Sequence, residues 1–312
     1  MSNQQPSPPN QPVDPGSSRK FFSAEFNGAR FGSFQDLKLP RFIELFKELE
    51  EFSTAYGQQV ASGEGWPETY PWPLDALHTN TRIWEYPFAL DALRRFAAPG
   101  ARILDIGSAL TFFPSFLASS GYEVVASDID PAMESSFRQL QPGLRALLGP
   151  KALERIAYRR EDVTRLSLED HSIEAVTNIS VLEHLPFEAL ERAIIEIRRV
   201  LVPGGLFICT LDTWMRGGPR TAHHSPLDQQ EFEAFMTSML DHFELLDRPR
   251  ITVPRDLITN LHCPLPTSSY NAAAATARRI RPFKALRALF NRPEPTPLEW
   301  SVFGTALESS ST

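Results

Sequence analysis

Three aspartates in the middle of the chain each follow a short apolar run. They are Asp105 in the stretch ILDIG, Asp128 in VVASD and Asp162 after RIAYRRE. A carboxylate can accept hydrogen bonds from two ribose hydroxyls at once, in the strong charge-assisted class. It can also accept from an exocyclic amine such as that of adenine. Taken singly, each acid is more simply a solvated strand end, but the set of three favours a ligand site.

Strands and helices that alternate along the chain would position these acids. Ligands of an open parallel sheet bind at the carboxyl ends of its strands, so the acids are expected to meet there. Alternation of this kind indicates a parallel α/β sheet. The apolar runs predict strands over 101–107, 122–130, 155–162, 172–180, 206–212, 243–251 and 300–309, and the segments between them predict helices over 112–120, 131–148, 186–201 and 225–243.

The first hundred residues have a different texture. Residues 1–19 are rich in Pro, Ser, Gln and Asn, which predicts a disordered tail. An amphipathic helix is expected from Pro40, with Phe42, Leu45 and Leu49 at helical spacing, and a second helix over 85–96. Residues 20–98 are therefore interpreted as a helical extension, which either covers the core edge or acts as a lid. Residues 99–309 form the main domain, with an insertion at about 252–298.

Bulk composition narrows the function classes. The chain has 312 residues, 42% of them hydrophobic, a formal net charge of −7 and two cysteines. The charge disfavours nucleic acid or an anionic membrane as a partner. Two cysteines are too few for a disulfide scaffold, which favours reduced thiols and a cytoplasmic location. The basic segment 278–292 is interpreted as a solvated helix face, with an anionic partner as the alternative. The oligomeric state is not predicted.

The ordered motifs ILDIGS, VVASDID, RREDV, NISVLEHL and RRVLVPGGLFICTLD resemble those of a class I S-adenosylmethionine-dependent methyltransferase. They cover about a third of the chain. RIWEYPFAL, before the first strand, resembles a segment of bacterial methyltransferases from small-molecule or surface-glycan pathways. The family resemblance implies a Rossmann-like seven-stranded sheet with helices on both faces and an antiparallel last strand. It implies S-adenosyl-L-methionine as the cofactor, contacted by Asp105, Gly107, Ser108, Ala109, Asp128, Ile129, Asp162, Val163, Ile179 and Ser180.

One feature departs from the family pattern. The loop after the first strand usually reads acid-x-Gly-x-Gly-x-Gly, but here Ala109 and Thr111 replace two of the glycines. We expect Ala109 to be tolerated with a negative φ, and Thr111 to lie where the chain is already helical. The loop then binds the cofactor in a remodelled form. The alternative is a non-catalytic binding or scaffold protein. A nicotinamide-binding domain is disfavoured, because its fingerprint needs more glycines than Gly107 alone.

The candidate catalytic residues are Glu183 and His184, which follow the fourth expected strand. A base is needed only if the acceptor must lose a proton, and His184 has a suitable ordinary pKa. The alternative is that His184 caps or packs the next helix. No metal is predicted, because Ser180 replaces the first glutamate of a metal-binding motif found in some relatives.

The acceptor pocket is assigned to residues outside the motif set, namely Trp84, Glu85, Tyr86, His223 and His224. Core packing of the first three, and an inert loop for the two histidines, are the alternatives. The predicted function is methyl transfer to an O or N atom of a small molecule, such as a sugar or a secondary metabolite.

Overall fold

The computed structural model describes residues 29–63, 65–67, 75–79, 81–214, 227, 229–246, 258 and 300–309. Several sequence-based predictions lie outside these residues. They concern the disordered tail 1–19, the pocket residues His223 and His224, the helix cap at Ser225, the basic segment 278–292 and nearly all of the insertion 252–298.

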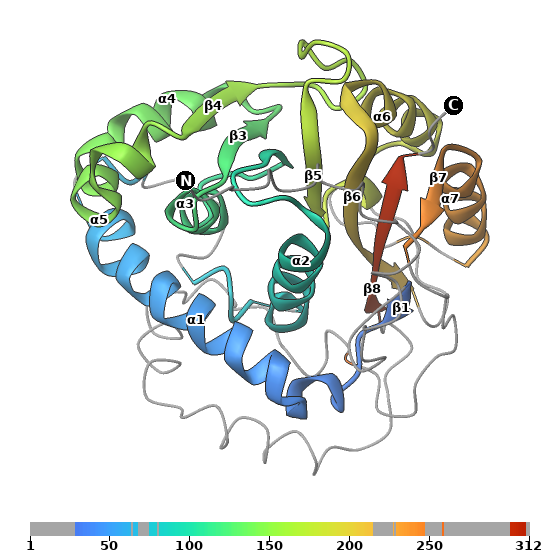
Figure 1. Ribbon diagram of the computed structural model, residues 1–312, viewed down its shortest axis with the longest axis horizontal. Helices are drawn as coiled ribbons and strands as arrows, with labels where there is room; N and C mark the ends of the chain where they lie inside the picture. The colour runs from blue at the N-terminus through green and yellow to red at the C-terminus, as the bar shows by residue number, and fades with distance from the viewer. Residues whose placement is uncertain are drawn as a thin grey trace, which may run out of the picture.

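A single sheet organises the molecule (Figure 1). Neighbouring strands run in the order β4-β3-β2-β5-β6-β8, and the first five of them are parallel to one another. β8 is antiparallel to β6 and also pairs with β7, so the predicted α/β fold with a returning antiparallel strand is confirmed. The strands are β2 (Arg102–Ile106), β3 (Glu123–Asp128), β4 (Ile156–Arg160), β5 (Ile173–Ile179), β6 (Leu201–Trp214), β7 (Phe243–Leu245) and β8 (Trp300–Ser309).

An eighth strand, β1 (Arg30–Phe31), was not anticipated from the sequence. It pairs antiparallel with β8, where Arg30 lies opposite Gly304 and Phe31 opposite Phe303. A two-residue strand is too short to show a period-2 pattern, so the sequence does not predict it. β1 and β7 therefore share the outer edge of β8.

Helices cover both faces of the sheet, and Figure 1 shows α6 and α7 on one side and α1, α2 and α3 on the other. Each face buries its own apolar cluster, because a parallel sheet must be covered on both sides. The helix expected over 131–148 is two helices in the structure, since Pro142 cannot continue the ladder of the first. The helices are α3 (Phe113–Ser119), α4 (Pro131–Gln139), α5 (Gln141–Leu153), α6 (Phe187–Val200) and α7 (Gln229–His242).

Two helices build the N-terminal extension. α1 (Pro40–Tyr56) buries Phe42, Leu45 and Leu49, as its periodicity predicts. α2 (Arg82–Phe96) begins three residues before the expected start and is almost completely buried. The last residue of α1 contacts the loop between β2 and α3, since the Tyr56 hydroxyl donates to the Leu110 carbonyl at 3.0 Å. The extension thus packs on the core and also touches the loop.

Candidate functional site

A cavity of about 220 Å³ opens at the carboxyl ends of β2, β3 and β5. All of the residues that the sequence assigns to the cofactor line this one cavity, together with Tyr86 and His184 of the assigned acceptor and catalytic sets. Its remaining lining residues were not predicted. They are Ala76, Thr79, Arg82, Ile106, Thr111, Ser127, Glu161, Val181 and Leu185.

The turn after β2 depends on Gly107. Its φ is +62°, in the region that side chains with a Cβ rarely adopt. A Cβ built at Gly107 would lie 2.6 Å from Cγ2 of Val181 and 2.7 Å from Cγ1. The backbone therefore turns here because no side chain stands between β2 and the segment after β5.

Ala109 corrects the expectation of a negative φ, because its φ is +47°. Two hydrogen bonds hold this left-handed backbone. The Ala109 N–H donates to Asp128 Oδ2 at 3.2 Å, and the Tyr158 hydroxyl donates to the Ala109 carbonyl at 2.6 Å. A left-handed alanine costs about 1–2 kcal/mol, which these contacts must offset. The loop therefore keeps the glycine-type conformation at its second position without the glycine.

Asp105 lies buried at the end of β2. The Thr177 hydroxyl donates to Asp105 Oδ1 at 2.6 Å, and the Ser127 hydroxyl donates to the Asp105 carbonyl at 3.0 Å. Burial raises the pKa of Asp105 to about 7, against the opposing effect of the Thr177 hydrogen bond. This carboxyl group therefore changes charge near neutral pH, at the wall of the cavity.

Asp128 and Ile129 follow β3. Asp128 Oδ1 accepts from the Asp130 N–H at 2.9 Å, and Oδ2 accepts from Ala109. Each carboxylate oxygen has a second lone-pair direction, so both can still accept from a ligand. Burial raises the pKa of Asp128, while its backbone N–H partners lower it. Ile129 is 61% exposed and lines the cavity, which offers an apolar surface beside the carboxylate.

Residues after β4 complete this side of the cavity. Asp162 is exposed, and its Oδ1 accepts from the N–H and the hydroxyl of Thr164 at 2.9 and 2.8 Å. Val163 is buried. Asp128 and Asp162 line the same cavity from neighbouring strands, as the register of the motifs predicts.

A second group of polar residues faces the cavity from α2 and from the end of β5. Arg82 and Tyr86 project from α2, and Ser180 and His184 follow β5. Ser180 has a φ of +49°, and its hydroxyl donates to Glu85 Oε1 at 3.0 Å. Strained backbone of this kind concentrates at functional sites.

Arg82 is the functional candidate that sequence reasoning missed. It forms an ion pair with the buried Glu85. Burial lowers the pKa of Arg82, but nearby carboxylates, with Glu85 first, raise it by more. The signal was present in the motif RIWEYPFAL, whose first residue is Arg82, but the helix was expected to begin only at Glu85.

Three predicted site residues do not line the cavity. Trp84 is fully buried, donates to Asp36 Oδ2 at 2.7 Å and stacks on Phe88, so it packs the core as in the alternative interpretation. Glu85 is fully buried behind Arg82 and Ser180.

Glu183 also lies behind the cavity wall. Its Oε1 accepts from the Asp212 N–H at 3.1 Å, and its Oε2 has no hydrogen-bond partner among the described residues. Burial, and then the charge of Asp212, raise the pKa of Glu183. Of the two catalytic candidates, only His184 faces the cavity.

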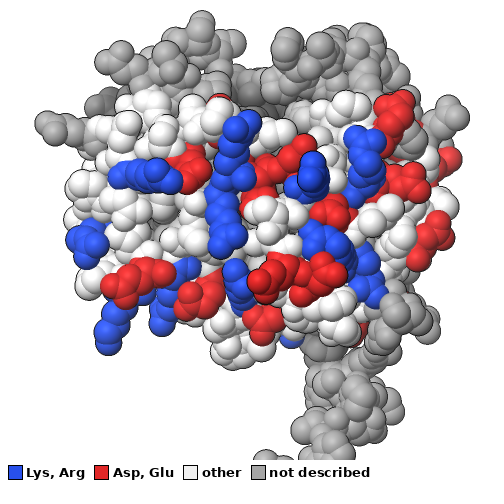
Figure 2. Space-filling model, turned by 90° about the horizontal axis from the view of Figure 1, so that it is seen from above, with Lys and Arg blue, Asp and Glu red and all other residues white. Residues whose placement is uncertain are grey.

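Figure 2 shows the face at the top of Figure 1, where basic and acidic side chains alternate instead of gathering in one region of a single sign. A strand of nucleic acid is expected to need a continuous basic surface. No described helix is long and apolar enough to cross a membrane.

Comparisons with known proteins match the sequence pattern to a family. Residues 104–209 match a family model described as a methyltransferase domain. The chain is 34% identical over 139 residues to a demethylmenaquinone methyltransferase of Clavibacter sepedonicus, covering 43% of this chain and 49% of that protein. It is 35% identical over 144 residues to a ubiquinone biosynthesis O-methyltransferase of Xanthomonas campestris pv. campestris, covering 45% of this chain and 52% of that protein.

The chain thus spans about half the length of the curated relatives it matches. Among solved structures, it is similar to a SAM-dependent methyltransferase from Methanosarcina mazei, with 16% identity, a TM-score of 0.44 and coverage of 70% of this chain and 96% of that one. The methyltransferase resemblance that the strand-end motifs suggest is confirmed to this extent: residues 104–209 match a methyltransferase-domain model.

Proposed function

We propose that this protein is an S-adenosylmethionine-dependent methyltransferase that acts on an O or N atom of a small molecule. The observation that carries the proposal is the convergence of Asp105, Gly107, Asp128 and Val163 on one cavity at the carboxyl ends of parallel strands. The methyltransferase-domain match supports it from the sequence side.

The residues of the cavity fit the proposed cofactor. Asp128 retains acceptor capacity for two ribose hydroxyls, and the exposed Ile129 beside it offers apolar contact to a base. Oδ2 of Asp162 can accept from an exocyclic amine, since Thr164 contacts only Oδ1. Arg82 is a cation that lines the cavity, and the donors that its ion pair with Glu85 leaves over suit a carboxylate. Together these residues offer partners for the ribose, the base and the amino-acid group of the cofactor.

When bound, S-adenosylmethionine supplies a methyl group on a positively charged sulfur. The chain's own contribution is to align the acceptor atom with that methyl group and to exclude water. Tyr86 of α2 and Ser180 and His184 after β5 line the cavity apart from the strand ends that carry Asp128 and Asp162, where an acceptor would lie. His184 is placed to take a proton from an acceptor hydroxyl, because it faces the cavity and Glu183 does not.

One of the two relatives favours oxygen as the acceptor atom, because it is named as a ubiquinone biosynthesis O-methyltransferase. The other is named as a demethylmenaquinone methyltransferase, a name that states no acceptor atom. A small hydroxylated acceptor is therefore our first choice, and a sugar or another secondary metabolite stays a prediction. A cytoplasmic location and the absence of a nucleic-acid partner also stay predictions.

The experiment is titration calorimetry of the purified protein with S-adenosylhomocysteine, the demethylated cofactor. We expect saturable binding to the wild type and a loss of about tenfold or more in Asp128→Ala, since a charge-assisted hydrogen bond contributes about 1.5–3 kcal/mol. Absence of binding to the wild type would refute the proposal. Tight binding without turnover across hydroxylated and amine acceptors would instead favour the non-catalytic alternative.

A further inference from the structure

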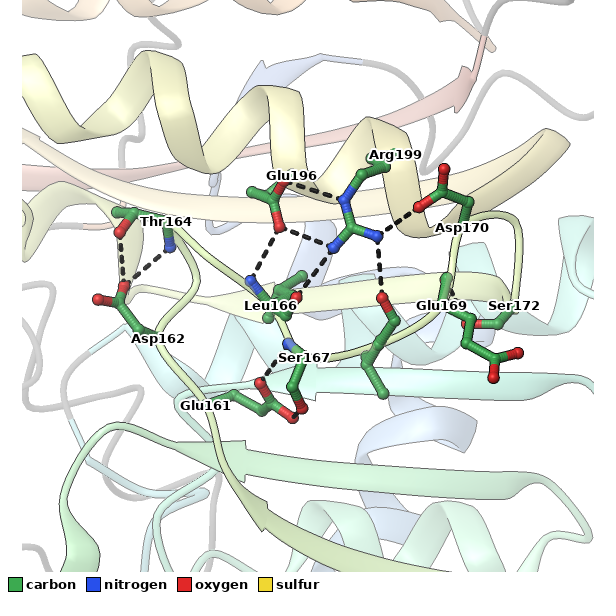
Figure 3. Close-up of polar contacts among 11 residues, drawn as sticks. Glu161, Asp162, Thr164, Leu166, Ser167, Glu169, Asp170, Ser172, Glu196 and Arg199 are labelled. Carbon is green, nitrogen blue, oxygen red and sulfur yellow. Dashed lines mark hydrogen bonds and ion pairs between the residues drawn. The ribbon is translucent and has the colours of Figure 1, made fainter.

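The loop that joins β4 to β5, residues 161–172, has two parts. Its first residues, Glu161, Asp162 and Val163, line the cavity. Its later residues run along the C-terminal end of α6, where they meet the side chains of Glu196 and Arg199 (Figure 3). A change in the contact between α6 and the later residues can therefore shift the cavity-lining residues, because only a few residues of backbone separate the two parts.

Arg199 uses all five of its N–H groups in this contact. Nε and one Nη2 hydrogen donate to the two oxygens of Glu196 at 3.0 and 2.8 Å. Nη2 also donates to the Leu166 carbonyl at 2.9 Å. Nη1 donates to the Leu168 carbonyl at 2.9 Å and to Asp170 Oδ1 at 2.6 Å. One guanidinium thus holds three positions of the loop and its own helix.

Glu196 contributes the opposite half of the contact. Its Oε2 accepts from the Leu166 N–H at 2.9 Å, so Leu166 is held at both its N–H and its carbonyl. The hydrogen bond from Arg199 lowers the pKa of Glu196, which keeps this acceptor ionised. Next along the loop, the Ser167 N–H donates at 2.8 Å to Oε2 of Glu161, a residue of the cavity wall.

Asp162 has no comparable anchor of its own. The contacts of Asp162 itself are local: Thr164 donates to its carboxylate, and the Arg165 N–H donates to its carbonyl at 2.8 Å. These contacts fix the shape of a short turn, and the Glu161 N–H, which donates to the Asp128 carbonyl at 3.0 Å, ties the first end of that turn to the sheet, but its other end needs a second constraint. The anchoring at Leu166 and Ser167 supplies that second constraint.

We propose that Arg199, paired with Glu196, is a positioning residue that sets the place of Asp162 in the cavity and so the discrimination of the cofactor's base. This inference rests on the proposed function, because it takes Asp162 as the acceptor for the exocyclic amine of adenine. Lysine cannot replace Arg199, since it has three donors on one nitrogen while the contact uses five donors in a planar fork.

The test compares two ligands that differ at that edge of the base, where S-inosylhomocysteine has a carbonyl in place of the amine and a proton on the neighbouring ring nitrogen. The affinities of S-adenosylhomocysteine and S-inosylhomocysteine are measured by calorimetry for the wild type, Arg199→Ala, Arg199→Lys and Arg192→Ala. Arg192 is an exposed arginine of the same helix, and it donates a hydrogen bond to the Glu188 carbonyl at 3.3 Å. Thermal unfolding of each variant accompanies the titrations.

We expect the wild type and Arg192→Ala to prefer the adenine ligand by about tenfold, the effect of one charge-assisted hydrogen bond. In Arg199→Ala the preference should fall below about threefold, with Arg199→Lys between the two. A general loss of protein stability would weaken the binding of both ligands alike and leave the ratio of their affinities unchanged.

An unchanged ratio in folded Arg199→Lys or Arg199→Ala would overturn the inference, as would a wild type that binds both ligands equally well. A wild type that binds neither ligand would instead refute the proposed function itself. The two failures are therefore distinguishable.

Discussion

The loops after β2 and after β4 reach the same cavity but are held in different ways. The loop after β2 contains two left-handed residues, Gly107 and Ala109, and buried or half-buried groups hold its backbone directly. The loop after β4 lies largely on the surface, and one guanidinium of α6 holds it from outside. In the loop after β2, the strained residue Ala109 is held by hydrogen bonds made directly to its own backbone. In the second, the one left-handed residue is His171, with a φ of +53°, which lies far from the cavity-lining residues in the chain, and the support is several residues away from Asp162.

This difference predicts how each loop responds to substitution. Where the backbone itself is strained, a change of one atom that removes a support or adds a clash alters both folding and ligand binding. Where a distant side chain holds a loop in place, substitution of that side chain changes the selectivity of ligand binding more than the stability of the fold. Partly exposed ion pairs contribute modestly to stability, so the second loop can loosen while the domain stays folded.

Gly107→Ala is expected to have the largest effect. The added Cβ meets the side chain of Val181 and also forces a left-handed φ, so we expect a loss of about 3 kcal/mol in the free energy of unfolding. Binding of S-adenosylhomocysteine should be lost as well. Denaturant unfolding and calorimetry measure the two effects.

The matched control is Gly100→Ala. Gly100 has a φ of +78°, and a Cβ there meets no atom within 4 Å. It lies just before β2, at the end of the strand away from the cavity. This variant should lose about 1–2 kcal/mol of stability and keep its affinity. Equal affinities of the two variants would contradict the role given to the turn.

Tyr158→Phe is expected to have an intermediate effect. It removes the donor to the Ala109 carbonyl and leaves the strained alanine with one support instead of two. We expect a loss of about 1 kcal/mol in stability and about tenfold in affinity for S-adenosylhomocysteine, measured by denaturant unfolding and calorimetry.

Tyr122→Phe serves as the comparison, because Tyr122 is buried and lies just before the amino end of β3, whereas the cavity lies at the carboxyl ends of the strands. If both tyrosine variants bound the ligand like the wild type, the Tyr158 hydroxyl would have no part in holding the loop.

Ala109→Gly is expected to have the smallest effect. Glycine removes the penalty of the left-handed φ but adds chain entropy to the unfolded state, so stability should rise by no more than about 1 kcal/mol. Affinity should stay within about twofold, because Asp128 and Tyr158 contact only backbone atoms of residue 109. Ala109→Val should lower the stability instead of raising it, since a β-branched residue tolerates this φ poorly. A destabilised glycine variant would show that the alanine is not strained.

Much of the first loop's surroundings could be predicted from the sequence, because strand ends carry strong signals. The apolar runs locate β2 to β6, and the residues that follow them are fixed at one edge of the sheet whatever the helices do. This is why all the assigned cofactor residues line one cavity. The φ of Ala109 was not predictable, since it depends on Tyr158, which lies 49 residues further along the chain.

The other wall of the cavity was harder to predict. A motif such as RIWEYPFAL places residues on a helix, but it does not say which of them face the sheet, the core or the cavity. Trp84 points to Asp36, and Arg82 and Tyr86 face the cavity. Glu183 follows the right strand but turns toward Asp212, one strand away. Orientation of this kind comes from long-range packing, which a single sequence does not encode locally.

The place of β8 in the sheet has a consequence for synthesis of the protein. β8 pairs with β6 along one side and with β1 and β7 along the other, although it follows all of the other described strands in the sequence. Until it leaves the ribosome, β6 presents an open edge flanked by apolar residues such as Phe207 and Leu211. Such an edge can pair with another nascent chain. Slow translation or a chaperone that shields this edge should therefore raise the yield of active protein, because contacts so distant in sequence form late.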